Sequence, residues 1–169
     1  MKTNMNRKGI SNVVATIILI AVAIALAVAV AVWVFGLAGS ASKTATLQVQ
    51  AVSLTGVSTK QATLTLIVSN PSSSGIGING FTLGSLSCVF SSPVQVPAGT
   101  QGGQLTIALT ISGGAFTGVS SVTGSNGITA SGITASCSGS QTAAVGIQYS
   151  GYITTVSGQT YPFTVTASS

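Results

Sequence analysis

The chain has 169 residues, of which none is Asp, Glu or His and five are Lys or Arg, so its formal net charge is +5. The ordinary general acids and bases are missing, and so are the groups that activate a serine or cysteine nucleophile, which argues against an enzyme. A pair of Lys60 with a serine is the one catalytic arrangement left open. No metal site is expected, because two cysteines alone leave a coordination shell incomplete.

The N-terminal residues 1–9 end in a basic-glycine junction, Arg7-Lys8-Gly9, directly before a long apolar run. A secretory signal has an apolar core of about 7–15 residues followed by a cleavage site of small residues. Here the run is about twice that long and the junction precedes it. We therefore expect residues 1–9 to be a leader and the apolar segment to be kept.

The five basic residues are concentrated in this leader, which carries Lys2, Arg7 and Lys8. The net charge is thus mostly a property of the precursor, and no nucleic acid partner is expected. Basic residues beside an apolar span favour the cytoplasmic side of a membrane. This orientation places the remainder of the chain, residues 42–169, outside the cell.

The apolar run over residues 10–41 predicts a single helix. Between Ala21 and Val34 alanine alternates with larger aliphatic residues, but both sets are apolar and the run is far too long for a strand. The helix would be about 48 Å long, whereas roughly 20 residues cross the hydrocarbon core of a bilayer. Because it is apolar on every face, it must be surrounded by lipid or by copies of itself. Its alanines would let neighbouring helices approach closely.

Beyond Gly39 the composition changes to Ser, Thr, Gly and β-branched residues, which predicts a domain boundary near residues 39–44. Alternating apolar and polar residues predict half-buried strands at 61–68 and 105–111, and weaker strands at 47–51, 147–149 and 161–165. Turn signals lie at 70–72, 97–99, 113–114 and 125–127. Together these patterns predict an α+β chain, in which a long N-terminal apolar helix precedes one antiparallel, immunoglobulin-like β-sandwich head over 42–169.

The two cysteines, Cys88 and Cys137, both lie in the expected outer domain. Outside the cell a disulfide between them would persist, and closing a loop of this length stabilises a fold by roughly 4 kcal/mol. The alternative is two buried free thiols that act as small apolar residues. We favour the disulfide.

The outer domain must stay in water with only Lys43 and Lys60 as charged side chains. About a third of it is Ser or Thr, whose hydroxyls hydrate the surface or accept O-linked glycans. The alternative is that packing between subunits hides the surface. N-linked sugar is not expected, because the one matching triplet, Asn70-Pro71-Ser72, has a central proline. No cofactor other than such glycans is expected, and we assign the tyrosines Tyr149, Tyr152 and Tyr161 to the core or to subunit contacts.

The first 40 residues resemble the N-terminus of archaeal type IV pilins. The resemblance is carried by Arg7-Lys8-Gly9-Ile10-Ser11, by the run Val13–Ile20 and by Trp33-Val34-Phe35-Gly36-Leu37. The Ser/Thr-rich domain is similar to crenarchaeal adhesive pilins in general character only. The resemblance implies a lollipop-shaped subunit, a membrane protein as a precursor and an extracellular surface filament when mature.

The resemblance also implies partners and roles. A membrane-embedded prepilin peptidase would cut after Gly9 within the processing residues Arg7, Lys8, Gly9 and Ile10, and an assembly ATPase and a membrane platform protein would build a helical homopolymer. The β domains would form the sheath of that filament. Its core would be formed by Ile10, Val14, Ile17, Ile20, Ile24, Val28, Val32 and Phe35.

One residue departs from the bacterial members of this family, which carry a glutamate where this chain has Val14. No charge pair would then set the register between subunits, and shape must do so. Two other readings stay open: an archaellin-like motility filament, and a cell-surface protein anchored by an uncleaved helix with no filament. A third, a secreted domain released near Ala41, is disfavoured by the long apolar run.

Overall fold

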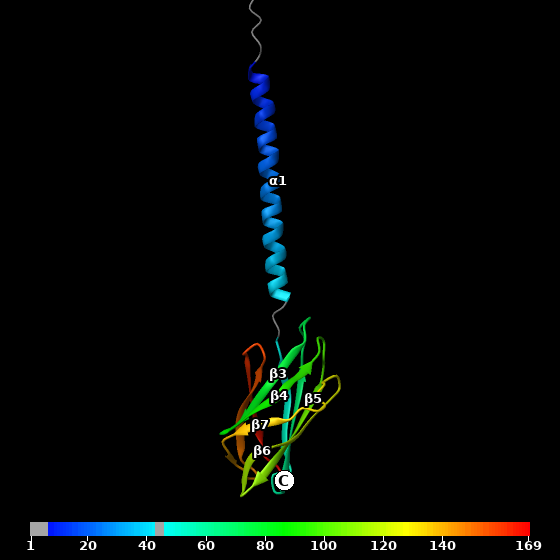
Figure 1. The fold of residues 1–169 in the computed structure, drawn as a ribbon, viewed down its shortest axis with the longest axis vertical. Coiled ribbons are helices and arrows are strands. Elements are labelled where there is room, and N and C mark those ends of the chain that lie inside the picture. Colours follow the sequence, from blue (N-terminus) through cyan, green and yellow to red (C-terminus); the bar gives the residue numbers. More distant parts are fainter. Residues whose placement is uncertain (1–6, 43–45) are drawn as a thin grey trace, which may run out of the picture. The chain divides into compact units, whose positions relative to one another are not determined.

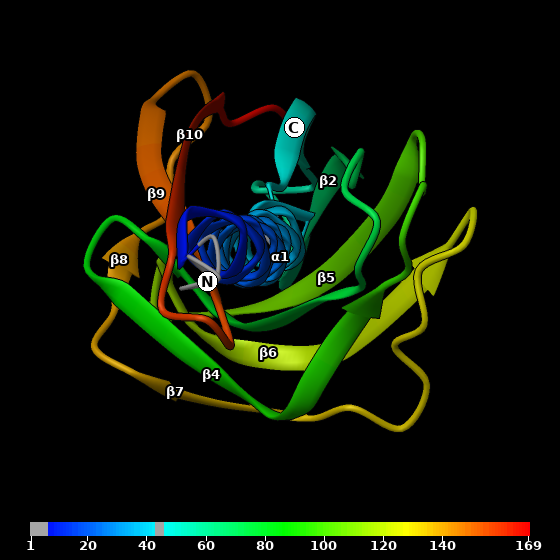
Figure 2. The same ribbon diagram turned by 90° about the horizontal axis from the view of Figure 1, so that it is seen from above.

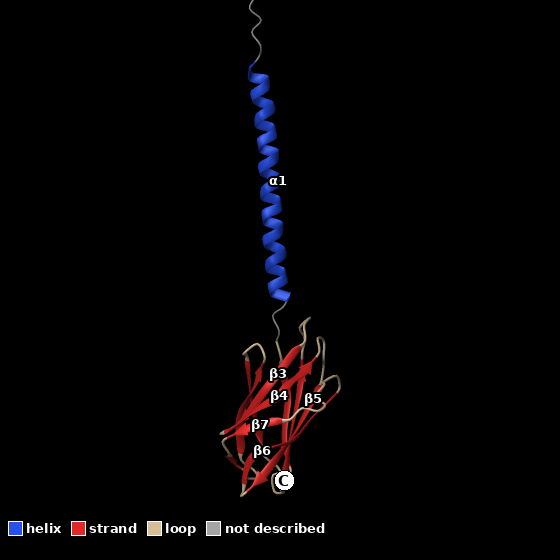
Figure 3. Cartoon of the chain, in the orientation of Figure 1, coloured by secondary structure: helices blue, strands red, loops and turns tan. Residues whose placement is uncertain are grey.

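The computed structural model describes residues 7–42 and 46–169. It divides the chain into two compact units, the first of which ends at Ser42. Figures 1 and 3 show that the first unit is helical and that the second consists of strands. Most of the expected leader, residues 1–6, lies outside the described residues, as do residues 43–45.

The first unit is the single helix α1, Arg7–Ser42, with 36 residues. At about 1.5 Å per residue it is roughly 54 Å long. The prediction of an apolar N-terminal helix is confirmed, and the observed helix extends three residues before the expected start and one beyond the expected end. Arg7 and Lys8 favour helix, which accounts for the earlier start.

The second unit is built from two five-stranded antiparallel sheets. The first, sheet A, has the strand order β1-β2-β5-β6-β8, and the second, sheet B, has the order β10-β9-β3-β4-β7. Figure 2 shows β9 beside β10, and β2, β5 and β6 in succession. The strands are β1 (Gln48–Thr55), β2 (Gln61–Ser69), β3 (Ile76–Leu83), β4 (Leu86–Val96), β5 (Gly103–Ser112), β6 (Ala115–Ser125), β7 (Ala135–Ser138), β8 (Gln141–Thr142), β9 (Gln148–Thr155) and β10 (Thr160–Thr166).

Each of the five predicted strands corresponds to an observed one, namely β1, β2, β5, β9 and β10. The alternation of apolar and polar residues predicted these strands because only one side of each sheet is buried. On β2, Leu64 and Leu66 are buried while Thr65 between them is half-buried on the opposite face. The buried sides of both sheets contribute to one hydrophobic core, which is the arrangement of a sandwich.

Two tight turns lie at the residue pairs that predicted them. Gly113 and Gly114, between β5 and β6, have φ values of +59° and +76°. A two-residue hairpin with positive φ at both central residues matches the twist of the flanking strands, and glycine adopts that conformation without strain. The turn after β6 uses Asn126 and Gly127 in the same way, at φ +53° and +98°.

Asn70 is a fully buried amide where β2 ends. Its Nδ2 donates hydrogen bonds to the carbonyls of Ser74 at 2.8 Å, Val96 at 3.1 Å and Pro97 at 3.2 Å. Its backbone N–H donates to the carbonyl of Thr100 at 2.8 Å. The predicted turn at 70–72 is therefore attached to the turn that follows β4, and this amide connects the two sheets.

Candidate functional site

The apolar helix α1 is the first candidate for function. From Ser11 to Gly36 it is long and apolar enough to cross a membrane, with a mean hydropathy of 3.2. The large apolar side chains described in this span are 47 to 77% exposed. A helix with no polar face requires an apolar environment on every side.

Thr16 is one of the few polar residues in this span, and its hydroxyl is already paired. Its Oγ1 donates to the carbonyl of Asn12, one turn earlier, at 2.7 Å. A hydroxyl bonded to its own helix does not need a partner from water. It therefore does not prevent the span from entering lipid or a bundle of helices.

The alternation of alanine with larger residues has a geometric consequence in a helix. A step of two residues turns about 200° around the axis, so that residues four apart share a face. Ala21, Ala25 and Ala29 then form one stripe on α1. Ala23, Ala27 and Ala31 form a second stripe on the opposite side. Small residues at this spacing let helix backbones approach closely, so α1 has two opposite faces suited to close neighbours.

The expected filament-core residues form one broad strip between these alanine stripes. Their spacing of three or four residues places them on the same side of a helix. Val14, Ile17 and Ile24 are between 49 and 60% exposed, and Phe35 is 77% exposed. These four are accessible to a neighbouring molecule, whereas the side chain of Ile10 lies outside the described residues. The filament-core role of the whole set stays a prediction.

The expected processing residues all lie in the first turn of α1, which begins at Arg7. Gly9 and Ile10 belong to the same continuous helix, so the predicted cleavage bond is in helical backbone. Their side chains lie outside the described residues. The role of these residues also stays a prediction.

The two cysteines form a disulfide with an S–S distance of 2.06 Å. Cys88 on β4 lies directly opposite Cys137 on β7 in the antiparallel ladder. Cys88 is buried and Cys137 packs against the core. The bridge attaches the four-residue edge strand β7 to sheet B, and neither sulfur is a free thiolate that could bind a metal.

The outward face of sheet A carries hydroxyl groups in register. Ser53, Thr65, Thr106 and Thr123 lie opposite one another on β1, β2, β5 and β6. The Oγ1 of Thr123 donates to the carbonyl of Thr106 at 3.5 Å, a weak local bond. This face is uncharged along the row and presents hydroxyl and methyl groups to its surroundings.

The three tyrosines differ in their surroundings. Tyr149 is buried, packs edge-on against Phe116 with ring centroids 5.7 Å apart, and its hydroxyl donates to the carbonyl of Thr142 at 2.6 Å. Tyr161 is half-buried, and its hydroxyl donates to Gln159 at 2.7 Å. Tyr152 is 44% exposed on the outward face of β9. Tyr149 therefore has the expected core role. Tyr152 lies outside the core, and for it the other expected role, a subunit contact, stays a prediction.

Comparisons with protein-family models and with curated proteins find no match for this chain. Its function is therefore inferred from its residues and their geometry.

Proposed function

We propose that the chain is the structural subunit of an extracellular archaeal type IV pilus, which polymerises through α1, exposes the β domain and serves in surface adhesion. The observation that carries this proposal is α1 itself. It is 36 residues long, and its described side chains from Ser11 to Gly36 are exposed and almost all apolar. The apolar span of α1 follows the basic-glycine junction Arg7-Lys8-Gly9, which forms the first turn of the same helix.

Such a helix is compatible with two environments, the membrane and the core of a filament. In the precursor, residues 11–36 cross the membrane. In the filament, the same side chains exchange lipid tails for identical helices, with little hydrophobic penalty because both surroundings are equally apolar. The length beyond one bilayer span provides extra contact between helices, and dispersion forces act over all of it.

The two opposite alanine stripes favour a polymer over a closed pair. A helix with a single small-residue face associates with one partner through that face. α1 has one stripe from Ala21 to Ala29 and another from Ala23 to Ala31 on the other side. Each subunit can thus contact two close neighbours at once. Repetition of this contact without closure builds an open filament.

Assembly of this kind involves a prepilin peptidase that cuts between Gly9 and Ile10, an assembly ATPase and a membrane platform protein. The β domain then forms the outer sheath. Apart from the short strands β7 and β8, consecutive strands alternate between the two sheets in pairs: β1 and β2 in sheet A, β3 and β4 in sheet B, β5 and β6 in sheet A, and β9 and β10 in sheet B. This order supports an immunoglobulin-like head. The hydroxyl rows of sheet A provide acceptors for O-linked glycans.

A membrane-anchored surface protein is the second candidate, because a mostly apolar span of 26 residues is enough to anchor a chain. The experiment that separates the two is a substitution at the cleavage site, Gly9→Val, in cells that express the protein on their surface. The matched control is Gly9→Ala, which keeps a small residue. We expect Gly9→Val to abolish filaments counted by electron microscopy and to leave an uncut precursor in the membrane, while Gly9→Ala retains filaments. Equal surface protein and no filaments in all three strains would favour the anchor.

A further inference from the structure

The outward face of sheet B is hollowed along its central strand β3. One hollow of about 420 Å³ is lined by Gly75, Ile76, Gly77, Pro93, Gln95, Val156 and Ser157. A second of about 100 Å³ lies further along the same strand, and its lining includes Asn79, Gly80, Val89 and Tyr152. We call these two hollows together the β3 furrow.

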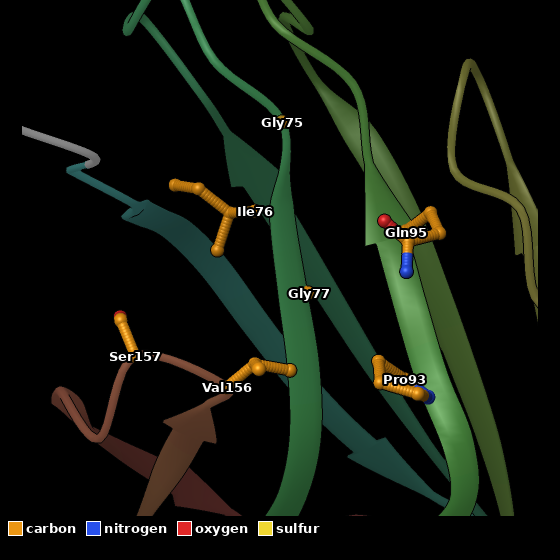
Figure 4. A pocket seen from close by; sticks show the side chains of 7 residues that line it. All are labelled: Gly75, Ile76, Gly77, Pro93, Gln95, Val156 and Ser157. Carbon is orange, nitrogen blue, oxygen red and sulfur yellow. The ribbon is translucent and has the colours of Figure 1, made fainter. Parts of the chain in front are cut away.

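Glycine creates the first hollow. A Cβ at Gly77 would lie 2.9 Å from Cγ2 of Val156 and 3.1 Å from Cβ of Pro93. Figure 4 shows Val156 and Pro93 on opposite sides of Gly77. The backbone N–H of Val156 donates to the carbonyl of Gly77 at 2.9 Å, which holds that wall against the floor.

Exposed apolar and amide groups surround the furrow. Val156 is 61% exposed, Val89 is 54% exposed and Tyr152 is 44% exposed. The side chains of Asn79 and Gln95 are also exposed beside them. An apolar wall with a tyrosine ring and a few amide and hydroxyl groups is the usual composition of a site for a small polar organic ligand.

The charges of the chain exclude several ligand classes. Every residue that lines the furrow is uncharged, and Lys60 lines a separate hollow between the turns at 57–60 and 111–114. Recognition of phosphate, sulfate or carboxylate groups relies on Arg and Lys partners. The furrow therefore suits a neutral ligand.

The strand order argues against an extended peptide. A peptide that adds to a sheet pairs with the free edge of an outer strand. β3 is bordered by β9 and β4 on its two sides and pairs with both. A ligand lying on β3 must be held by side chains from above, through stacking on an apolar ring and hydrogen bonds from amides and hydroxyls.

We propose that the β3 furrow binds a neutral oligosaccharide chain. The C–H faces of successive sugar rings pack on Tyr152 in the second hollow and on Val156 in the first. The hydroxyls of these rings pair with Asn79 and Gln95, whose amides both donate and accept. This inference rests on the proposed function, which places the β domain outside the cell. It identifies neutral glycans as the class of surface to which the pilus adheres.

The experiment measures retention of the full-length protein, kept in a detergent without a sugar headgroup, on immobilised dextran, mannan, galactan and chitin. Carboxymethyl-dextran provides the charged form of the same polymer, and about 0.5 M salt screens the basic leader. We expect retention on at least one neutral polymer and at least tenfold weaker retention on the charged one. Retention on none of the neutral polymers overturns the proposal.

Substitutions then locate the binding site. Gly77→Ala narrows the first hollow by contact with side chains alone, and Tyr152→Ala removes the ring. Each is expected to weaken retention about tenfold or more. The matched control is Gly118→Ala on β6 in sheet A, where an added Cβ meets nothing within 4 Å. Retention unchanged by both furrow variants overturns the proposal.

Counting filaments in the same strains keeps this inference apart from the proposed function. If Gly77→Ala removes filaments while sugar binding persists, the furrow is a contact between copies of the chain and the sugar proposal is wrong. If sugar binding is lost and filaments are normal, the furrow is the binding site. Failure of the pilus proposal is seen instead as an absence of filaments in the parent strain.

Discussion

The two units of this chain treat apolar surface in opposite ways. The β domain buries its leucines, isoleucines and valines between two sheets and turns hydroxyls outward. The helix α1 has equally apolar residues, and those described from 11 to 36 are exposed. The domain can therefore be stable by itself, whereas the helix requires lipid or other helices. That contrast is the physical reason to expect assembly through α1.

The largest expected effect comes from a charge placed in α1. Val28 lies between the two alanine stripes and is 57% exposed. Substitution Val28→Asp puts a carboxylate into an apolar bundle, at a cost of about 2.5–3.5 kcal/mol per subunit by membrane insertion scales. Repeated along a filament, this cost should abolish assembly while the β domain keeps its fold.

Electron microscopy of filaments sheared from the cell surface measures assembly, and the melting temperature of the purified protein measures the stability of the β domain. The control is Ser58→Asp, at an exposed turn position in the β domain. Filaments that form normally with Val28→Asp would show that α1 is not the assembly helix.

The disulfide gives the next effect, which is confined to the β domain of one subunit and is not multiplied along a filament. Cys88 and Cys137 are separated by 49 positions, and opening such a loop costs about 4 kcal/mol of unfolding free energy in the chain-entropy model. The double variant Cys88→Ala with Cys137→Ala should lose about that amount in urea unfolding, with the helical signal of α1 unchanged. If reductant alters the parent protein and the double variant equally, the bridge is not the cause.

Asn70 should give a smaller effect on the same domain. Asn70→Ala leaves the carbonyls of Ser74, Val96 and Pro97 without the bonds from its Nδ2. Buried polar groups that lose their partners cost about 1–3 kcal/mol, so we expect a loss of about 2–3 kcal/mol in urea unfolding. The control Gln101→Ala, at an exposed amide, should change stability by less than about 0.5 kcal/mol. Equal losses in both would contradict the role given to Asn70.

The smallest expected effect is that of pH. Acid unfolding arises mainly when carboxylates that are charged in the fold must be protonated, so that stability is lost as pH falls through their folded pKa. This chain has no Asp, Glu or His side chain, and the slope of stability against pH should be near zero. The free energy of unfolding, obtained from melting curves between about pH 2 and about pH 8, should vary by less than about 1 kcal/mol. A large fall at acid pH would mean that an unrecognised group titrates.

The sequence predicted those elements in which a single periodicity repeats. β2 and β5 have an apolar residue at every second position, and two threonines of each strand lie on the opposite face. The apolar run of α1 is too long for a strand. The turns at Gly113-Gly114 and Asn126-Gly127 were visible because positive φ requires such residues. Local chemistry was sufficient in each case.

The sequence did not predict the strands β3 and β4, nor the β3 furrow on the outward face of sheet B. The alternation on β3 is interrupted by a register shift between Ile78 and Gly80, and β4 has a proline at position 93. The walls of the furrow come from segments about 60 to 80 residues apart, such as Pro93 and Val156. Their proximity depends on the order of strands in sheet B, which no local pattern encodes. The two glycines of β3, Gly77 and Gly80, were the one available signal.

The most direct test of the central claim is the N-terminal sequence, with the intact mass, of protein sheared from the surface of cells that express it. Assembly through α1 predicts that the chain begins at Ile10, with any mass above the calculated value due to glycans. A chain that still carries Arg7-Lys8-Gly9 would contradict processing and leave α1 as a membrane anchor, and a chain that begins near Ala41 would contradict any role for α1 in a filament.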